Sequence, residues 1–507
     1  MEILLPLLVA LPLGVAFGIV ILAHVPALRR ATGVLAAAAV LANLVIAVRI
    51  FNLPSMAFHV GGWGGGKTLG IELVCDGLAK VMLVTVNFIA FVAIVFAGPY
   101  MRRFTKLWLF QSLFLLMTGA MNAVVLAGDL FNLFVFIEVA AIASYALVAF
   151  GTEAEELEAA FKYLVLGTVG SAFILLGVAI LYSLTGQLNM AKVAQGLTVI
   201  GSGPAVLLAA AALIGGLALK AAMVPFHAWL PDAHPSAPAP ISAMLSGLLI
   251  KTSGIYALAR IVFNVLGPTT QYAYILIILG AASMVIGMFL ALGQWDFKRL
   301  LAYSSISQAG YIVLALGAAA YLVATGGETW VAKLCLFGAF FHLFNHAAFK
   351  SLLFLSSGAI EQQAGTRQLR EMGGLVRTMP VTSFCCRVGA LSISGVPPFS
   401  GFFSKLVIII SLALAARTSD NPALMYTLCA IAVGVAVGTL LMYIKVQRYA
   451  LEGPQAAAGA EVKEAPVLMC AALVILAIVC LGAGVALLGF REYIFDPVSG
   501  ALLGALR

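Results

Sequence analysis

Two lysines, Lys220 and Lys251, lie well inside apolar runs of the segment Gly215–Arg260. A lysine at the centre of a membrane helix costs about 2.5–3.5 kcal/mol on insertion scales, so such residues generally have a function. The stretch between them contains these helix-breaking or polar residues: Pro225, His227, Pro231, Asp232, His234, Pro235, Pro238 and Pro240. Proline interrupts a helix, and a membrane helix tolerates a break where protein or a water-filled cavity satisfies the freed backbone groups. The pattern therefore indicates an ion path.

Other ionisable residues lie equally deep in apolar runs. Glu138, His342 and His346 are near the centres of their predicted helices. Lys405 lies about 10 Å along the helix axis from the centre of its predicted helix, taking 1.5 Å per residue. Since these six groups share roughly one depth and come from five different helices, we expect a path that runs in the membrane plane.

In the first half of the chain, one buried acidic residue and two buried lysines predict a group whose protonation can change. Glu138 and Lys220 are expected to form an ion pair; a purely structural pair is the alternative, but it is usually no better than apolar packing. Lys251 has no second acidic partner deep in its half. A lysine buried without a counter-charge gives up its proton more easily, which suits a proton relay.

The second half offers two histidines on one helical face. His342 and His346 are four residues apart, so their rings point the same way. Proton relay is favoured over structural hydrogen bonding or metal binding, because the Glu and the third ligand of a hydrolase motif are missing. Lys350 continues this face toward the predicted helix end, where relay and snorkelling are equally reasonable roles.

The proline-rich breaks contain the candidate gating residues. In the first break these are Pro225, His227 and His234, and in the second Pro397 and Pro398. The two histidines are expected either to gate the path or to hydrogen-bond carbonyls freed by the break. His24, His59 and Asp76 are expected in loops.

The composition is that of a polytopic helical membrane protein. Of 507 residues, 63% are hydrophobic and 9% are charged, whereas soluble domains carry about 25% charged residues. Continuous apolar runs exclude a soluble enzyme and argue against a β-barrel. The net charge of +8 comes from basic residues scattered in short loops, so nucleic-acid binding is not expected. The seven cysteines are expected to be small buried hydrophobes.

A requirement of roughly 20 apolar residues per span predicts about fourteen membrane helices. They are expected near 3–23, 31–51, 78–98, 107–127, 129–150, 161–184, 205–230, 239–261, 272–292, 300–321, 332–357, 383–412, 423–445 and 466–489. The first is interpreted as a membrane helix rather than a signal peptide, because no basic segment precedes it. Basic residues, including Lys298, are more frequent in the loops after odd-numbered helices. The positive-inside rule therefore predicts that those loops lie in the cytoplasm and that both termini lie outside.

Two spans are interrupted by proline, five helices apart. The seventh breaks at MVPFHAW and the twelfth at SGVPPFSGFFSK. Paired interruptions of this kind indicate repeated bundles with a binding site in each half. Because five is odd, successive repeats would have inverted topology.

Several motifs together resemble a known family. They are LALKAAMVPFHAWLPDAHPSAPAPISAMLSGLLIKTSGIYAL, FHLFNHAAFKSLLFLSSGAI, TRQLREMGGLVRTMP, SGVPPFSGFFSK, DLFNLFVFIEVAAIASYALVAF and GGWGGGKTLGIELVCDGLAKVML. They look like the signatures of the antiporter-like subunits of respiratory complex I, Mrp-type multisubunit cation/proton antiporters and energy-converting membrane-bound hydrogenases. The resemblance covers nearly the whole chain.

The resemblance implies an all-α fold with fourteen helices and two inverted five-helix repeats, helices 4–8 and 9–13, in which helices 7 and 12 are broken. The implied division is helices 1–3 in 1–106, the first repeat in 107–262, the second in 270–446 and helix 14 in 447–507. Glu138, Lys220, Lys251 and Lys405 look like the family's helix-5 glutamate, helix-7 lysine, connecting helix-8 lysine and terminal helix-12 lysine. His342, His346 and Lys350 fall at its helix-11 motif. Within the family, the chain is most similar to the Mrp D-type subunit and its hydrogenase relatives.

The chain is thus expected to be a proton-translocating, non-catalytic subunit of a translocase or antiporter in the cytoplasmic membrane, without a cofactor or bound metal. Expected partners are other membrane subunits, including related antiporter-like ones, the lipid bilayer, H⁺ and, as a further candidate, Na⁺. One alternative is a self-sufficient Na⁺/H⁺ or solute transporter. Another is a haem or quinone redox subunit with His342 and His346 as ligands.

Overall fold

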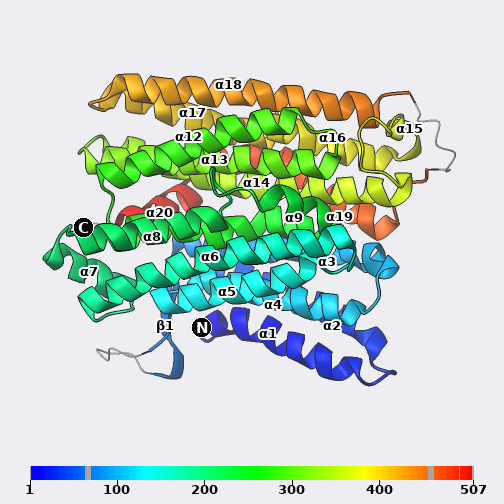
Figure 1. Cartoon of the computed structure of the whole chain (residues 1–507), viewed down its shortest axis with the longest axis horizontal. Helices are drawn as coiled ribbons and strands as arrows, with labels where there is room; N and C mark the ends of the chain where they lie inside the picture. The colour runs from blue at the N-terminus through cyan, green and yellow to red at the C-terminus, as the bar shows by residue number, and fades with distance from the viewer. Residues whose placement is uncertain (1, 63–69, 455–461, 490, 505–507) are drawn as a thin grey trace.

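The computed structural model describes residues 2–62, 70–454, 462–489 and 491–504. Long helices lie side by side, with α1 at one edge of the bundle and α18 at the other (Figure 1). Within the described ranges, thirteen helices are long and apolar enough to cross a membrane. The predicted class, an all-α polytopic membrane protein, is confirmed.

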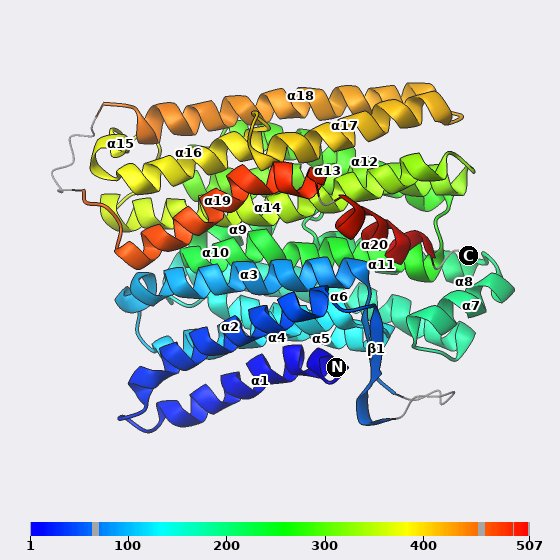
Figure 2. The ribbon, with the colours of Figure 1, turned by 180° about the vertical axis from the view of Figure 1, so that it is seen from behind.

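The N-terminal part contains the first three spans and a β-hairpin. The helices are α1 (Leu4–Ala23), α2 (Thr32–Phe51) and α3 (Gly77–Tyr100). Strands β1 (Met56–His59) and β2 (Glu72–Cys75) pair antiparallel between α2 and α3, at one end of the bundle (Figure 2). The hairpin was not predicted, and most of the GGWGGGK motif, residues 63–69, lies outside the described residues.

The next helices run to the centre of the molecule. They are α4 (Leu107–Leu126), α5 (Leu130–Val148), α6 (Ala154–Thr185), α7 (Met190–Ile200), α8 (Pro204–Lys220) and α9 (Leu230–Ser236). A continuous helical span, Ala239–Leu266, follows. It consists of α10 (Ala239–Met244), π-helical turns over Leu245–Tyr256, α11 (Ala257–Arg260) and further π-helical turns over Ile261–Leu266. We call Ala239–Leu266 the central helix.

The remaining helices complete the bundle. They are α12 (Thr270–Leu292), α13 (Phe297–Ala324), α14 (Thr329–Ala364), α15 (Leu375–Thr378), α16 (Pro380–Ser394), α17 (Ser400–Thr418), α18 (Pro422–Val446), α19 (Val467–Gly489) and α20 (Arg491–Leu503). Short 3₁₀ turns cover Arg29–Ala31, Val60–Gly62 and Met101–Arg103, and a π-helical turn covers Gln447–Leu451. Helices α7 and α20 were not predicted.

Both predicted helix breaks are present. The seventh span stops at Lys220 and becomes helical again at Leu230, and the twelfth stops at Ser394 and resumes at Ser400. A cis peptide bond precedes Pro225 in the first break and Pro398 in the second. The α8 part has 17 residues, too few to count as a span alone. With this half-helix, the thirteen spans of the described ranges correspond to the fourteen predicted.

Close contact between α12 and α13 requires glycine. A Cβ on Gly310 would lie 2.6 Å from the backbone oxygen of Gly280 on the facing helix, closer than such atoms approach. Small residues let two membrane helices pack backbone to backbone. This pairing fixes α13, whose side chains face the central polar groups.

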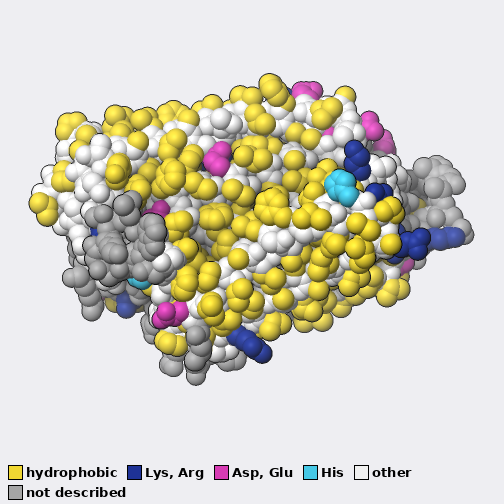
Figure 3. Space-filling view, turned by 90° about the horizontal axis from the view of Figure 1, so that it is seen from below, with side chains coloured by type: hydrophobic (Ala, Val, Ile, Leu, Met, Phe, Trp, Pro, Cys, Tyr) yellow, Lys and Arg dark blue, Asp and Glu magenta, His cyan; other side chains and the backbone are white. Residues whose placement is uncertain are grey.

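The central helix is the core of the bundle. Its most apolar stretch is completely buried, and it packs against α3, α4, α8 and α14. The outside of the bundle is apolar: hydrophobic side chains cover most of the face in Figure 3, while Lys and Arg gather toward its ends. A multi-pass membrane protein needs such a surface, because lipid surrounds its flanks.

Candidate functional site

Glu138 and Lys220 meet where the seventh span breaks. Lys220 is the last residue of α8, is 7% exposed, and its Nζ lies 3.1 Å from Oε1 of Glu138 on α5. Ser171 of α6 donates a hydrogen bond to the same carboxylate. The carbonyl groups at a helix C-terminus favour a cation. The structure thus brings the two residues of the predicted pair together at a polarised helix end.

A small cavity separates Lys220 from the central helix. Its volume is about 10 Å³, and its lining includes Lys220, Tyr163, Trp229 and Ser253. A space of this size approaches that of one water molecule. Trp229 Nε1 donates to the freed carbonyl of Leu219 at 3.1 Å, which satisfies part of the broken backbone.

Lys251 is fully buried in the middle of the central helix. In the described part of the chain no acidic side chain pairs with it, and its ammonium donates to the carbonyl oxygen of Ser246. The Ser246 hydroxyl lies 2.7 Å from that of Ser305 on α13. Lys251 is close enough for its charge to act on His346 and Lys350.

Lys350 lies inside α14 and not near its end. The helix continues to Ala364, beyond the predicted end at 357, so Lys350 is fully buried and does not snorkel. Its Nζ donates to Leu301 O at 2.7 Å and to the Ser304 hydroxyl. Lys350 therefore joins α14 to α13 next to Ser305, the residue of α13 that contacts Ser246.

His342, Tyr311 and Lys405 form the far end of the buried group. His342 Nδ1 is 2.9 Å from the Ser404 hydroxyl of α17, and its ring centroid is 5.6 Å from that of Tyr311. Lys405 Nζ lies 5.1 Å from the centre of the Tyr311 ring and donates to Ile393 O at 2.7 Å. The ammonium therefore rests on a carbonyl at the end of α16, beside the second break.

His346 is fully buried, with its ring centroid 6.3 Å from that of His342. Both ring nitrogens of His346 lack a hydrogen-bond partner within the described residues. A buried imidazole without partners is costly unless water or a transferred proton reaches it. The structure therefore places the histidines side by side, as their spacing predicts.

The predicted gating residues divide into exposed and buried ones. Pro225, Pro397 and Pro398 are exposed and His227 is half-buried, whereas His234 is fully buried. Of the two alternatives for His234, gating or a hydrogen bond to a freed carbonyl, the second is not formed, because both of its ring nitrogens lack partners among the described residues. The Ser242 hydroxyl instead donates to His234 O at 2.7 Å and to Ala237 O at 3.1 Å.

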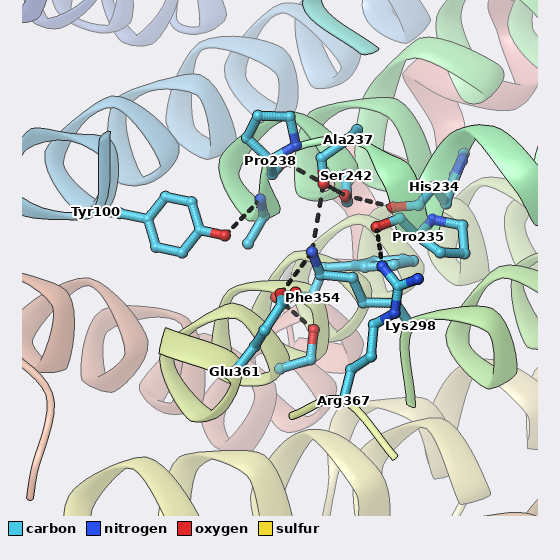
Figure 4. A network of polar contacts seen from close by, with 12 residues as sticks. Tyr100, His234, Pro235, Ala237, Pro238, Ser242, Lys298, Phe354, Glu361 and Arg367 are labelled. Atoms are coloured by element: carbon cyan, nitrogen blue, oxygen red, sulfur yellow. Dashed lines mark hydrogen bonds and ion pairs between the residues drawn. The ribbon is translucent and has the colours of Figure 1, made fainter. Parts of the chain in front are cut away.

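The sequence reasoning missed a second buried ion pair. Lys298 Nζ of α13 lies 2.8 Å from Glu361 Oε2 of α14, and Lys298 is 2% exposed (Figure 4). Lys298 was expected in a loop because the predicted span began at 300, but α13 begins at Phe297. Asp296 caps this helix by accepting from Arg299 N at 2.9 Å. An Asp before an apolar run is a known helix-start signal and would have corrected the boundary.

A third pair lies at the other end of the central helix. Arg260 Nη2 is 2.6 Å from Oδ1 of Asp76, which lies in the connection between β2 and α3, as predicted, and caps α3. Burial tends to raise the pKa of Asp76, but the Arg260 guanidinium and backbone N–H groups lower the pKa below its usual value. The pair lines a cavity of about 780 Å³ together with Glu72 and Tyr256.

A large cavity lies at each end of the central helix. The cavity at its beginning has a volume of about 390 Å³, adjoins the link before Ala239 and is lined by residues including Lys298 and Glu361. The 780 Å³ cavity adjoins the last turns of the helix, from Tyr256 to Leu266. Lys251 lies about midway along this helix.

Residues 127–432 match the family model described as NADH:quinone oxidoreductase/Mrp antiporter, TM. The chain belongs to this family. As an antiporter-like subunit, it is 37% identical to NADH-quinone oxidoreductase subunit N of Desulforudis audaxviator, over 97% of each chain. It is 33% identical to the D-type polypeptide of the Na(+)/H(+) antiporter of Alkalihalophilus pseudofirmus, over 89% of this chain and 87% of that relative.

Two solved structures have the same fold as this antiporter-like subunit. A chain of the Mrp complex from Dietzia sp. DQ12-45-1b has a TM-score of 0.87 at 26% identity, over 99% of this chain and 98% of that one. A chain of the membrane-bound sulfane sulfur reductase, an archaeal respiratory membrane complex, has a TM-score of 0.85 at 28% identity, over 100% of both. The family resemblance stated from the motifs is confirmed. The chain is an antiporter-like membrane subunit of the kind found in Mrp and complex I-like assemblies.

Proposed function

We propose that the chain is a Mrp D-type, proton-translocating subunit of a larger membrane complex. Protons move in the membrane plane along Glu138, Lys220, Lys251, the His342–His346 face with Lys350, and Lys405. Redox chemistry or Na⁺ exchange in partner subunits drives or uses this movement. Similarity to the D-type polypeptide of a Na(+)/H(+) antiporter over most of both chains, and to chains of two multisubunit complexes, supports the assignment.

The ion pair at the α8 break carries the proposal. With Glu138 at 3.1 Å, Lys220 is stabilised as an ammonium; when the pair parts, the buried ammonium loses its counter-charge and its proton moves on. Re-forming the pair reloads the site. Because the lysine is the last residue of α8, a small change in the non-helical link can alter the distance between the charges.

The contacts beyond Lys220 support parts of the proposed line. Lys350 donates to the Ser304 hydroxyl of α13, and Lys251 donates to the backbone carbonyl of Ser246, whose hydroxyl contacts that of Ser305 on α13. His342 then lies beside the ring over which Lys405 is placed. Hydroxyl groups can both donate and accept, so they can carry protons between ionisable groups.

The division into two inverted repeats, 107–262 and 270–446, is part of the proposal, with 1–106 and 447–507 as flanking parts. Each proposed repeat holds one broken span in corresponding position, and each break has a buried lysine beside it, Lys220 or Lys405. Proposed partners are further antiporter-like and redox or cation-exchanging subunits. The proposed location is the cytoplasmic membrane, with both termini outside.

Substitution of the pair within the assembled complex tests the function. Glu138→Gln and Lys220→Ala are expected to abolish proton pumping in vesicles while native gels show normal assembly. Lys333→Ala, a substitution on α14 outside the proposed line, serves as the control and is expected to pump normally. Full pumping by either variant of the pair would refute the relay.

Reconstitution separates this function from the two alternatives. The purified chain alone in liposomes is expected to show little cation-dependent proton flux; vigorous Na⁺/H⁺ exchange would indicate a self-sufficient transporter. A visible absorption band in the purified chain would indicate a haem subunit instead. The reaction that the purified complex performs then identifies the partner chemistry.

A further inference from the structure

The proposed relay makes no use of the Lys298–Glu361 pair. Lys298 Nζ contacts Glu361 at 2.8 Å and also donates to Ala237 O at 3.4 Å (Figure 4). Ala237 lies in the short link between α9 and the central helix. One ammonium therefore holds together α13, α14 and the start of the helix that carries Lys251.

The two members of the pair differ in their access to water. The side chain of Glu361 is 22% exposed and that of Lys298 only 3%. Both line the 390 Å³ cavity, which has room for about a dozen waters at roughly 30 Å³ each. Glu153, Glu155 and Glu156 line this cavity too, together with the basic residues Arg103 and Arg367. Glu361 is thus the member of the pair that can exchange protons with the cavity.

His234 lies in α9, just before the same link, and its side chain is buried in the bundle. It is three residues before Ala237, and its ring is 5.5 Å from that of Phe354 on α14, the helix of Glu361 (Figure 4). The ring is fully buried, and neither nitrogen has a hydrogen-bond partner in the described structure. The positive charges of Lys251 and Lys350 oppose protonation of this ring, so it would hold an added proton only briefly. A neutral imidazole here has one free lone pair that can accept a proton.

We propose that Glu361 is the proton-loading group of the central line and that Lys298 is its counter-charge. Hydronium in the cavity gives a proton to the Glu361 carboxylate, which becomes a neutral acid and releases water. Water then carries the proton from the acid to the lone-pair nitrogen of His234, which becomes an imidazolium, and Glu361 returns to the carboxylate that re-forms its pair with Lys298. This inference rests on the proposed translocation and adds the place where protons enter.

A purely structural ion pair is the competing explanation, and two variants separate it from loading. Glu361→Gln removes the proton-accepting carboxylate with little change in shape. The double variant Lys298→Met/Glu361→Met replaces both charges by apolar groups, which commonly preserves or improves stability. Glu155→Gln, on a side chain 80% exposed at the same cavity, is the matched control.

The experiment measures proton uptake driven by the intact complex in membrane vesicles, normalised to assembled complex. Loading predicts loss of uptake in Glu361→Gln and in the double variant, partial recovery in Glu361→Asp, and no change in Glu155→Gln. Normal uptake by the double variant would overturn the proposal, and it decides the matter if Glu361→Gln fails to assemble. Glu138→Gln is measured in parallel: loss there with normal uptake in Glu361→Gln refutes only the loading site, whereas normal uptake in Glu138→Gln refutes the relay itself.

Discussion

Arg260 and Asp76 are 184 positions apart in the chain, yet their Nη2 and Oδ1 atoms lie 2.6 Å from each other. The contact joins the end of the central helix to the first turn of α3. Arg260 also donates to the Tyr256 hydroxyl at 3.0 Å. Its side chain is only 11% exposed, so removing either partner leaves a poorly solvated charge.

Replacement of Arg260 by Met should therefore destabilise the protein. Breaking a buried pair from one side costs about 3–5 kcal/mol, because the remaining charge is uncompensated. The measurement is the thermal unfolding midpoint of the detergent-purified complex. Arg417→Met, at an exposed position at the end of α17, is the control and should change stability by less than about 0.5 kcal/mol. Equal shifts in the two variants would contradict a stabilising pair.

Asp129, the N-cap of α5, should make the free energy of unfolding decrease as the pH rises from about 4 to about 6. Burial raises the pKa of Asp129 from 3.8 to about 6, so the folded state binds a proton more tightly than the unfolded state. The stabilisation is complete below the unfolded pKa and is lost as the pH rises through about 6. Asp129→Asn keeps the capping oxygen and should flatten this dependence in thermal unfolding measured across the same range. An unchanged profile in the variant would assign the dependence to other groups.

Glycine at position 310 should be irreplaceable by alanine. The added methyl group would lie 2.6 Å from Gly280 O and 2.7 Å from Met284 Cγ; overpacking of this kind costs about 1–3 kcal/mol. Gly434→Ala on α18 is the matched control, because its Cβ would meet no atom within 4 Å and alanine favours the helix. Thermal unfolding of both variants is the test, and equal stability would show that α12 and α13 can separate without cost.

Lys350 should be required for proton movement although it has no acidic partner in the described structure. Lys350→Met keeps the bulk of the side chain but removes the donor to Leu301 O and Ser304. Proton pumping should be lost while assembly persists. Lys333→Met, on the same helix, should pump normally. Pumping by Lys350→Met at the control rate would remove this residue from the proposed line.

The spans and both breaks could be predicted from the sequence because their signals are local. A run of apolar residues defines each span, and Pro225 and Pro398 mark the interruptions. The β-hairpin, α7 and α20 lack such signals: their strands and helices are short and depend on packing against the bundle. The boundary errors that mattered were small. A shift of three residues at the start of α13 turned the buried Lys298 into an expected loop residue.

Pairing was predictable only where few partners were available. Glu138 was the one deep carboxylate of its half, so Lys220 was its natural partner. Asp76 and Glu361 lie at helix ends, where carboxylates are usually solvated, and their basic partners come from distant parts of the chain. Sequence spacing contains no information on such contacts. The folded bundle is needed to show that Lys298 and Arg260, like Lys220, form ion pairs with carboxylates in its interior.

The positions of these pairs constrain how the central helix can behave. Lys298 contacts the link at its beginning, and Arg260 is bound to Asp76 near its end. Sliding or rotating the central helix would break the hydrogen bond from Lys298 to Ala237 O at one end and separate the charges of Arg260 and Asp76 at the other. These contacts resist movement of the helix that carries Lys251, so the proposed relay would pass a proton along it by movements of side chains and not of the helix itself. In the proposed function, coupling to a partner subunit would then act on the interrupted helices beside the central helix.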